Sequence, residues 1–212
     1  MVIDSTATVL ALAPHADDIE YGCGATIARF ARAGAAIHYL VLSICEESVP
    51  ADFPKDVMAE EILAAAGRLG VAKQHVAVHR FPVRRLADHR QEILELMVEL
   101  RNRLRPNVVF APASDDMHQD HQVVANESVR AFKHATVLGY ELPWNSFRFD
   151  AICCLTVTDA DIAAKASACT AYRSQAHRTY GGGDWIQHLA RIRGLQAGVD
   201  LAEAFEVKRL IL

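Results

Sequence analysis

The 212-residue sequence lacks a strong excess of charge of either sign, since 22 lysines and arginines stand against 26 aspartates and glutamates. A formal net charge of −4 gives no electrostatic reason to expect binding to nucleic acid or to an anionic membrane surface. No apolar run approaches the roughly 20 residues that a membrane-spanning helix needs, and the first residues carry no basic leader. We therefore expect a protein of the cytoplasm, without nucleic-acid partners and without a membrane span.

Cysteine is scarce and irregularly placed. The five cysteines match no zinc-knuckle or disulfide spacing and stand at Cys23, Cys45, Cys153, Cys154 and Cys169. Reduced thiols in a reducing compartment are the plain interpretation. Internal repeats, low-complexity tracts and long linkers are lacking too, and 51% of the residues are hydrophobic. The sequence therefore predicts one globular domain over residues 1–212.

What the chain does contain is a regular alternation of apolar and helical segments. The predicted strands are short, aliphatic and partly β-branched, at residues 7–13, 37–43, 75–78, 107–111, 137–142, 151–157 and 204–212. The predicted helices cover residues 25–33, 55–69, 88–104, 120–134, 159–171 and 185–194. Such repeated βα units predict an α/β fold: a single Rossmann-like domain with a mostly parallel sheet and helices on both faces.

Two polar clusters follow two of these strands. The segment Pro14-His15-Ala16-Asp17-Asp18 comes directly after the first strand, and His118-Gln119-Asp120-His121 follows the strand at residues 107–111. In open α/β sheets, ligands bind beyond the carboxyl ends of the strands, near the point where the strand order reverses. We therefore expect the two clusters to meet in one crevice.

The residue types in these clusters are those of a catalytic zinc site. Such sites usually take three ligands from histidine and carboxylate side chains and keep one position for water. His15 and Asp18 are close enough in sequence to share one ion, and a histidine of the second cluster would complete a His-Asp-His set. Zinc lowers the pKa of a bound water to about 7, and the other acids and histidines are then candidates for proton transfer. Because such donors do not select strictly by affinity, iron(II) and cobalt(II) are alternatives to zinc.

The two clusters also resemble known motifs. Residues 14–24 resemble the signature of the LmbE/PIG-L family of N-acetylglucosaminyl deacetylases, and residues 118–121 resemble that family's second His-x-Asp-His motif. Residues 172–175 and 202–205 resemble the family more weakly. Ala16 stands where the family often has proline, and Ile19 where it often has an acid, but neither departure removes a proposed ligand. The order of the motifs and the βα pattern agree with the family, so the resemblance covers the fold as well as the site.

The resemblance implies a role for each residue. His15, Asp18 and His121 would bind one zinc ion per chain. Asp17 would take a proton from the water that zinc activates. His118 would donate a hydrogen bond or a proton to the carbonyl oxygen, and Asp120 would hold His118 in orientation. The implied reaction is hydrolysis of the N-acetyl group of an N-acetylglucosamine-containing or related amino sugar, which gives acetate and a free amine.

Other interpretations stay open at this level. An Asp-Asp pair before a helix is often a cap, and His118 and His121 alone would more often be surface residues. The alternative functions are metal-dependent hydrolysis of another N-acyl group or a phosphoester, and a non-catalytic sugar- or nucleotide-binding protein. Gly22 and Gly24 lack the dinucleotide-binding spacing, so no second cofactor is predicted.

Some features of the chain carry no assignment from sequence. Arg84, Arg85 and Arg173 are candidates to meet a phosphate or carboxylate of the substrate, although each is more often a surface residue. The roles of His177 and of the glycine loop at residues 181–183 stay open. The identity of the sugar is not readable, and a homo-oligomer is one alternative for the assembly.

Overall fold

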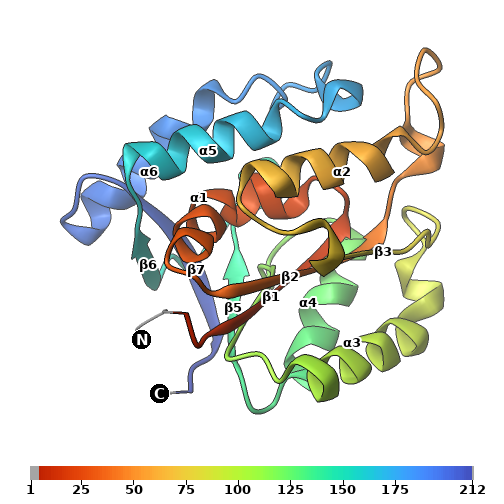
Figure 1. The fold of residues 1–212 in the computed structure, drawn as a ribbon, viewed down its shortest axis with the longest axis horizontal. Helices are drawn as coiled ribbons and strands as arrows, with labels where there is room; N and C mark the ends of the chain where they lie inside the picture. The colour runs from red at the N-terminus through yellow and green to blue at the C-terminus, as the bar shows by residue number, and fades with distance from the viewer. Residues whose placement is uncertain (1–4, 212) are drawn as a thin grey trace.

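In the computed structural model, which describes residues 5–211, these residues form one seven-stranded sheet with helices on both faces (Figure 1). The strand order is β3-β2-β1-β4-β5-β7-β6. The strands are β1 (Thr8–His15), β2 (Ala36–Ser43), β3 (Val76–Val78), β4 (Val108–Pro112), β5 (Thr136–Tyr140), β6 (Cys153–Thr156) and β7 (Ala202–Arg209). Strands β1 to β5 are parallel, whereas β7 pairs antiparallel with both β5 and β6. The predicted α/β fold with a mostly parallel sheet is confirmed.

The helices pack on both faces of the sheet and form one hydrophobic core on each face. They are α1 (Asp18–Arg32), α2 (Val57–Arg68), α3 (Arg90–Leu104), α4 (Gln119–Ala131), α5 (Asp159–Cys169) and α6 (Asp184–Ala197). Helices α1, α2 and α5 cover one face of the sheet, and α3 and α4 cover the other (Figure 1). Alternate side chains of β1 serve the two cores, since Val9 packs on the α1 side and Leu10 on the α4 side. A strand buried on both faces must be apolar throughout, which explains the continuous apolar run at residues 7–13.

The strand order reverses between β1 and β4, because the chain builds outward from β1 through β2 and β3 and then returns to β4. Both polar clusters follow these two strands, so they lie on either side of the reversal. None of the described helices is long and apolar enough to cross a membrane.

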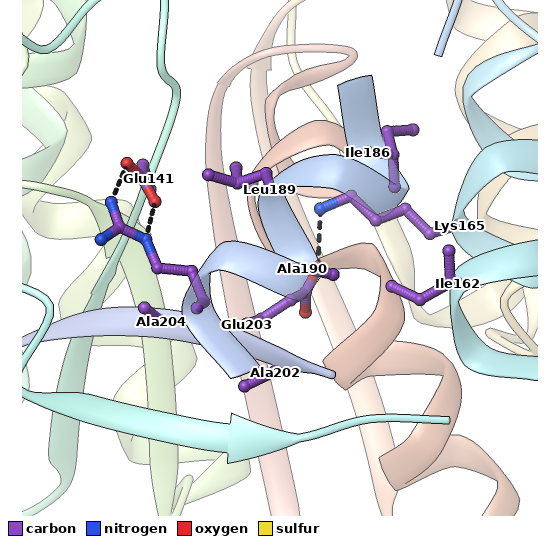
Figure 2. A pocket seen from close by; sticks show the side chains of 11 residues that line it. Glu141, Ile162, Lys165, Ile186, Leu189, Ala190, Ala202, Glu203 and Ala204 are labelled. Carbon is purple, nitrogen blue, oxygen red and sulfur yellow. Dashed lines mark hydrogen bonds and ion pairs between the residues drawn. The ribbon is translucent and has the colours of Figure 1, made fainter. Parts of the chain in front are cut away.

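Helix α1 begins at Asp18, seven residues before the predicted start at residue 25, and it contains a kink at Cys23 (φ −142°, ψ 20°). The kink frees backbone N–H groups inside the helix. Glu203 of β7 accepts hydrogen bonds from the amides of Thr26 (2.7 Å) and Ala25 (3.3 Å), and its carboxylate pairs with Lys165 (2.6 Å). Figure 2 shows this buried ion pair between α5 and β7. The adjacent cavity, about 20 Å³, is water-sized and too small for a substrate.

Gly22 is required at this bend by close packing. A Cβ atom there would overlap the ring of Tyr140, which is fully buried and held by a hydrogen bond from its hydroxyl to the Leu12 carbonyl (3.0 Å). Gly22→Ala is therefore expected to lower the free energy of unfolding by about 1–3 kcal/mol. Gly67→Ala in α2 is the matched control, because a Cβ there meets no heavy atom within 4 Å. Denaturant titration should show the control unchanged or up to about 1 kcal/mol more stable; equal effects would refute the packing argument.

Candidate active site

The six sequence-predicted site residues come together at the carboxyl ends of β1 and β4. His15 is the last residue of β1 and Asp18 the first of α1, whereas Asp120 and His121 lie in the first turn of α4. His15 and His121 contact each other across 106 residues of sequence. The first turn of each helix thus carries part of one site.

Three side-chain atoms converge with the spacing of a metal-ligand set. His15 Nδ1 lies 3.0 Å from His121 Nε2, and Asp18 Oδ2 lies 3.3 Å from each of these nitrogens. Ligands bound to zinc at about 2.0–2.1 Å are separated by similar distances when they share a tetrahedral ion. The backbone N–H of His15 donates to the same Asp18 oxygen (2.7 Å) and fixes the carboxylate. These residues fit a divalent cation such as zinc.

The outer nitrogen of each of these two histidines faces a carboxylate. His15 Nε2 lies 3.0 Å from Asp120 Oδ2, and His121 Nδ1 lies 2.7 Å from Asp116 Oδ2. When the outer nitrogens donate to these carboxylates, the lone pairs of the inner nitrogens are directed toward Asp18. In that state a divalent cation between them would be bound by both lone pairs and by the carboxylate oxygen. Metal-binding histidines in proteins are commonly oriented in this way.

The expected partner of Asp120 is therefore wrong. Its carboxylate does not contact the His118 ring but binds His15 and the backbone amides of Arg84 (2.5 Å) and Leu86 (3.1 Å). Only the backbone N–H of Asp120 reaches His118, donating to Nδ1 (3.2 Å). The first turn of α4 directs the Asp120 side chain toward β1, so the carboxylate positions a proposed metal ligand.

Asp116 was not singled out in the sequence, yet it organises the second cluster. Besides His121 it accepts a hydrogen bond from the His118 backbone amide (2.9 Å), and it is 1% exposed. An acid in the same loop, five residues before a proposed histidine ligand, was the available signal. Asp115 next to it is exposed, so sequence alone did not distinguish the two.

Asp116→Asn is expected to weaken zinc binding roughly 10- to 100-fold, because the His121 ring loses its charged partner. Titration against a competing chelator measures the affinity. Asp115→Asn removes the same charge from an exposed neighbouring position and should bind zinc like the unmodified protein. Equal affinities for the two variants would rule out an orienting role for Asp116.

The Asp17 side chain is buried but does not cap helix α1. It occupies the N-cap position of α1, and its side chain makes no capping hydrogen bond. The side chain lines the pocket instead. Burial, together with the adjacent Asp18 carboxylate, raises the pKa of Asp17 to about 7, against the opposing influence of His15. A carboxyl group with a pKa near neutrality is suited to exchange protons with a substrate.

His118 is the N-cap of α4, and this fixes the tautomer of its ring. Nδ1 accepts the Asp120 amide hydrogen bond, so in the neutral ring Nε2 carries the proton. Burial, with His15 and His121 nearby, lowers the pKa of His118 to about 4. The ring is thus neutral near pH 7 and is a hydrogen-bond donor at the pocket. His15, His118 and His121 also offer nitrogens within 4.8 Å of one another, but the set that contains Asp18 is tighter.

A buried Glu20–Tyr172 pair holds the turn that carries Asp17. The Tyr172 hydroxyl contacts the Ala16 carbonyl and lies 2.9 Å from Glu20 Oε2. Tyr172 is the donor to Glu20. Burial raises the pKa of Glu20 to about 8, against the opposing influence of this hydrogen bond. The segment at residues 172–175, which resembles the family only weakly, therefore supports the turn of the first motif through Tyr172.

The pocket beside these groups has a volume of about 300 Å³, which is typical of a site for a small molecule, and it is lined by His15, Asp17, Asp18, His118 and His121. The arginines considered in the sequence lie elsewhere. Arg84 pairs with Glu47 and Arg85 with Asp88, and Arg173 does not line the pocket. His177 does not line it either, and its Nδ1 faces the Ser174 carbonyl (3.1 Å). The pocket is lined instead by Arg178, which the sequence had not marked, together with Trp144 and Tyr180.

Hydrolases that use one metal ion place histidine and carboxylate ligands around it, next to groups that transfer protons. The fold and the site of this protein together have the arrangement of an α/β metallohydrolase. Within that class, the chain belongs to the PIG-L family, described as GlcNAc-PI de-N-acetylase, whose model matches residues 10–132. The match includes both polar motifs, so the predicted family is confirmed.

Individual proteins are similar over most of their length. The uncharacterized deacetylase YaiS of Escherichia coli is 30% identical over 148 residues, which are 66% of this chain and 77% of YaiS. The conserved protein TT1542 of Thermus thermophilus shares the fold with a TM-score of 0.80 and 30% identity, over 96% of this chain and 95% of that chain. The N,N'-diacetylchitobiose deacetylase of Pyrococcus horikoshii has a TM-score of 0.76 at 20% identity, over 94% and 83% of the chains. This last likeness shows the fold alone.

Proposed function

We propose that this protein is a zinc-dependent N-deacetylase that hydrolyses the acetamide of an N-acetylglucosamine-containing or related amino sugar. The observation that carries the proposal is the meeting of His15, Asp18 and His121 within 3.0–3.3 Å, in a pocket that also contains Asp17 and His118. The deacetylase relatives and the family's description support an amide as the bond that is cleaved.

The ion, when bound by these three side chains, supplies Lewis acidity for attack on a carbonyl group. Asp17 accepts the proton of the attacking water, and the protonated carboxyl then returns a proton to the leaving amine. His118 donates a hydrogen bond from Nε2 to the carbonyl oxygen as negative charge develops there. The carbon–nitrogen bond breaks, and acetate and a free amine leave.

The neutral state of His118 favours hydrogen-bond donation over full proton transfer, because a group with a pKa of about 4 is not protonated at neutral pH. This refines the role inferred from the sequence, which left both alternatives open. We also place the reaction in the cytoplasm, because the five cysteines are free thiols, as is typical of a reducing compartment.

The test is acetate and amine release from a panel of N-acetylglucosamine derivatives. Purified protein is assayed zinc-loaded, after chelation and after zinc is restored, and metal content is measured on the same samples. Release that chelation abolishes and zinc restores supports the proposal. Release of phosphate from phosphoesters, or sugar binding without any turnover, would favour one of the two alternative functions.

The pKa of Asp17 also predicts the pH dependence. Only the deprotonated carboxylate accepts a proton, so kcat/KM is expected to rise with pH along an acid limb and then level off. Because the pKa of Asp17 is raised to about 7 and a bound dication would lower it, the midpoint is expected at or below pH 7. A pH series of kcat/KM with zinc-loaded protein measures it. A rate that increases as the pH falls below 6 would contradict the assignment of Asp17 as the base.

A further inference from the structure

A second large cavity lies at the end of the sheet opposite the active site. Its volume is about 460 Å³, and it lies where α3 and α4, which pack side by side, both end (Figure 1). Pro106 and Ala135 line it and stand just before β4 and β5, so the cavity is at the amino ends of these strands. The 13 residues of α4 separate it by about 20 Å from the helix turn that carries His121. The cavity is therefore distinct from the site already described.

The charged groups of this cavity are all basic. Two guanidinium groups, those of Arg101 and Arg105, line it together with the His134 imidazole, and no carboxylate is among the described lining residues. Neither arginine forms an ion pair with a described residue, and the side chains of Arg105 and His134 have no hydrogen-bond partner in the described part of the chain. Like charges four residues apart repel each other unless an anion lies between them. The cavity thus has an unbalanced positive charge.

The acids on the neighbouring turns of both helices bind other arginines. Glu99 of α3 lies 3.7 Å from Arg103, and Glu127 of α4 lies 2.5 Å from Arg130 and also pairs with Arg90. None of these three arginines lines the cavity. The arginines outside the cavity are therefore neutralised by the protein, whereas the two inside it are left for an external anion.

The Arg101 guanidinium is held in place before any ligand binds. Its Nη1 donates to the Ala131 carbonyl at the end of α4 (3.0 Å), and its Nε and Nη2 donate to Asn102 Oδ1 (3.2 and 3.0 Å). Because the Asn102 oxygen is used in this way, its side-chain NH₂ group is left as a further donor at the cavity. A guanidinium that is already ordered loses less entropy when it binds an anion.

Arg105 occupies a backbone position that does not favour arginine. It follows α3 in the left-handed region (φ 47°, ψ 56°), where glycine or asparagine is usual. Pro106 cannot continue the helix, so the chain turns here and leaves the Arg105 side chain exposed at the cavity. Cations near the last carbonyls of a helix are generally favourable, which accounts for Arg101. It does not account for Arg105, whose side chain contacts no described carbonyl.

The base of the cavity is apolar. Pro106, Phe132 and Ala135 line it, and all three are buried. Ligand sites of a few hundred Å³ commonly combine an apolar lining with a small number of polar groups that fix the orientation of the ligand. A molecule with a charged group at the arginines and a compact apolar part over these residues matches both features.

We propose that this cavity is a second binding site, for a small organic anion that carries a carboxylate or a phosphate group next to an apolar part. Arg101 and Arg105 bind the anionic group through paired hydrogen bonds, which suit either anion. The Asn102 amide and the His134 imidazole are further donors. The inference goes beyond the deacetylase function and does not depend on it, since the cavity shares no described lining residue with the active-site pocket.

The experiment measures binding to zinc-loaded protein by amide chemical shifts, which report on the two sites separately. The probes are phenyl phosphate, benzoate and the neutral benzyl alcohol. An anion is expected to shift residues 101–106 and 131–135 and to bind there at least roughly 10-fold more tightly than benzyl alcohol. The tighter of the two anions identifies phosphate or carboxylate as the preferred group. Equal binding of benzyl alcohol, or shifts only around His15 and His121, would overturn the inference.

Arg105→Gln is expected to weaken the binding of the preferred anion roughly 10- to 100-fold. Arg103→Gln is the matched control, because Arg103 is an exposed arginine at the end of the same helix that does not line the cavity. Higher salt should weaken binding as well, since the Arg105 side chain is exposed. An equal effect of the two substitutions would contradict the role of Arg105.

Arg105→Gly tells a lost contact from a damaged fold. Glycine suits the left-handed position, so this variant should unfold at the same Tm as the unmodified protein or above it. It should nevertheless bind the anion as weakly as Arg105→Gln does. Normal anion binding by Arg105→Gly would show that the guanidinium is not part of the site and would overturn the inference.

Discussion

Replacing Asp17 by asparagine is expected to lower kcat by about 10²- to 10⁴-fold while the zinc content of the protein stays the same. The amide of asparagine has almost the shape of the carboxyl group but does not accept a proton from water. Asp17 takes no part in the convergent set of His15, Asp18 and His121, so metal binding does not require it. The variant also removes a buried carboxyl with a raised pKa, so stability is not expected to decrease.

Steady-state acetate release at saturating substrate and metal analysis of the same sample measure the two quantities. The control is Asp115→Asn, which removes one acid from an exposed position next to the second motif and should leave kcat unchanged. Loss of zinc from Asp17→Asn would contradict the separation of base and ligands. Turnover near the normal rate, with zinc retained, would remove Asp17 from the mechanism.

The central strands were predictable because parallel strands that are covered on both faces require continuous apolar runs, and residues 7–13 and 107–111 have them. The start of α1 was not predictable. The helix was predicted to begin at residue 25, whereas Gly22 already lies inside α1, where the ring of Tyr140 leaves no space for a Cβ atom. The antiparallel direction of β7 was equally unreadable, since a short apolar run does not state which neighbour it pairs with.

In the site, sequence predicted which residues would gather but not all of their contacts. Proximity in sequence suggested that Asp120 orients His118, and the helix turn instead directs its carboxylate to His15. Asp116 contacts His121, and Glu20 contacts Tyr172. These side-chain contacts depend on how the elements pack, and the spacing of residues in the sequence does not reveal them. Arg178 was passed over for the same reason, because its place in the pocket follows from the anchoring of its turn to α2.

His118→Ala is expected to lower kcat roughly 10²- to 10³-fold, with zinc retained. The neutral ring presents Nε2–H at the pocket, and no described side chain substitutes for that donor at the same position. The variant also removes the N-cap of α4, which should lower stability by about 1 kcal/mol and Tm by roughly 2–4 °C. A loss of activity in this variant therefore has two explanations, the missing Nε2–H donor or the lower stability of α4.

His118→Asn separates them. Asparagine is a good N-cap, so its side-chain oxygen can accept the Asp120 amide and restore most of the lost Tm. Its shorter side chain does not place a donor where the imidazole Nε2 lies, and kcat should stay as low as in His118→Ala. Recovery of kcat together with Tm would mean that His118 acts only as a cap. Loss of zinc in both variants would instead make His118 a ligand, in line with the cluster of three imidazoles within 4.8 Å.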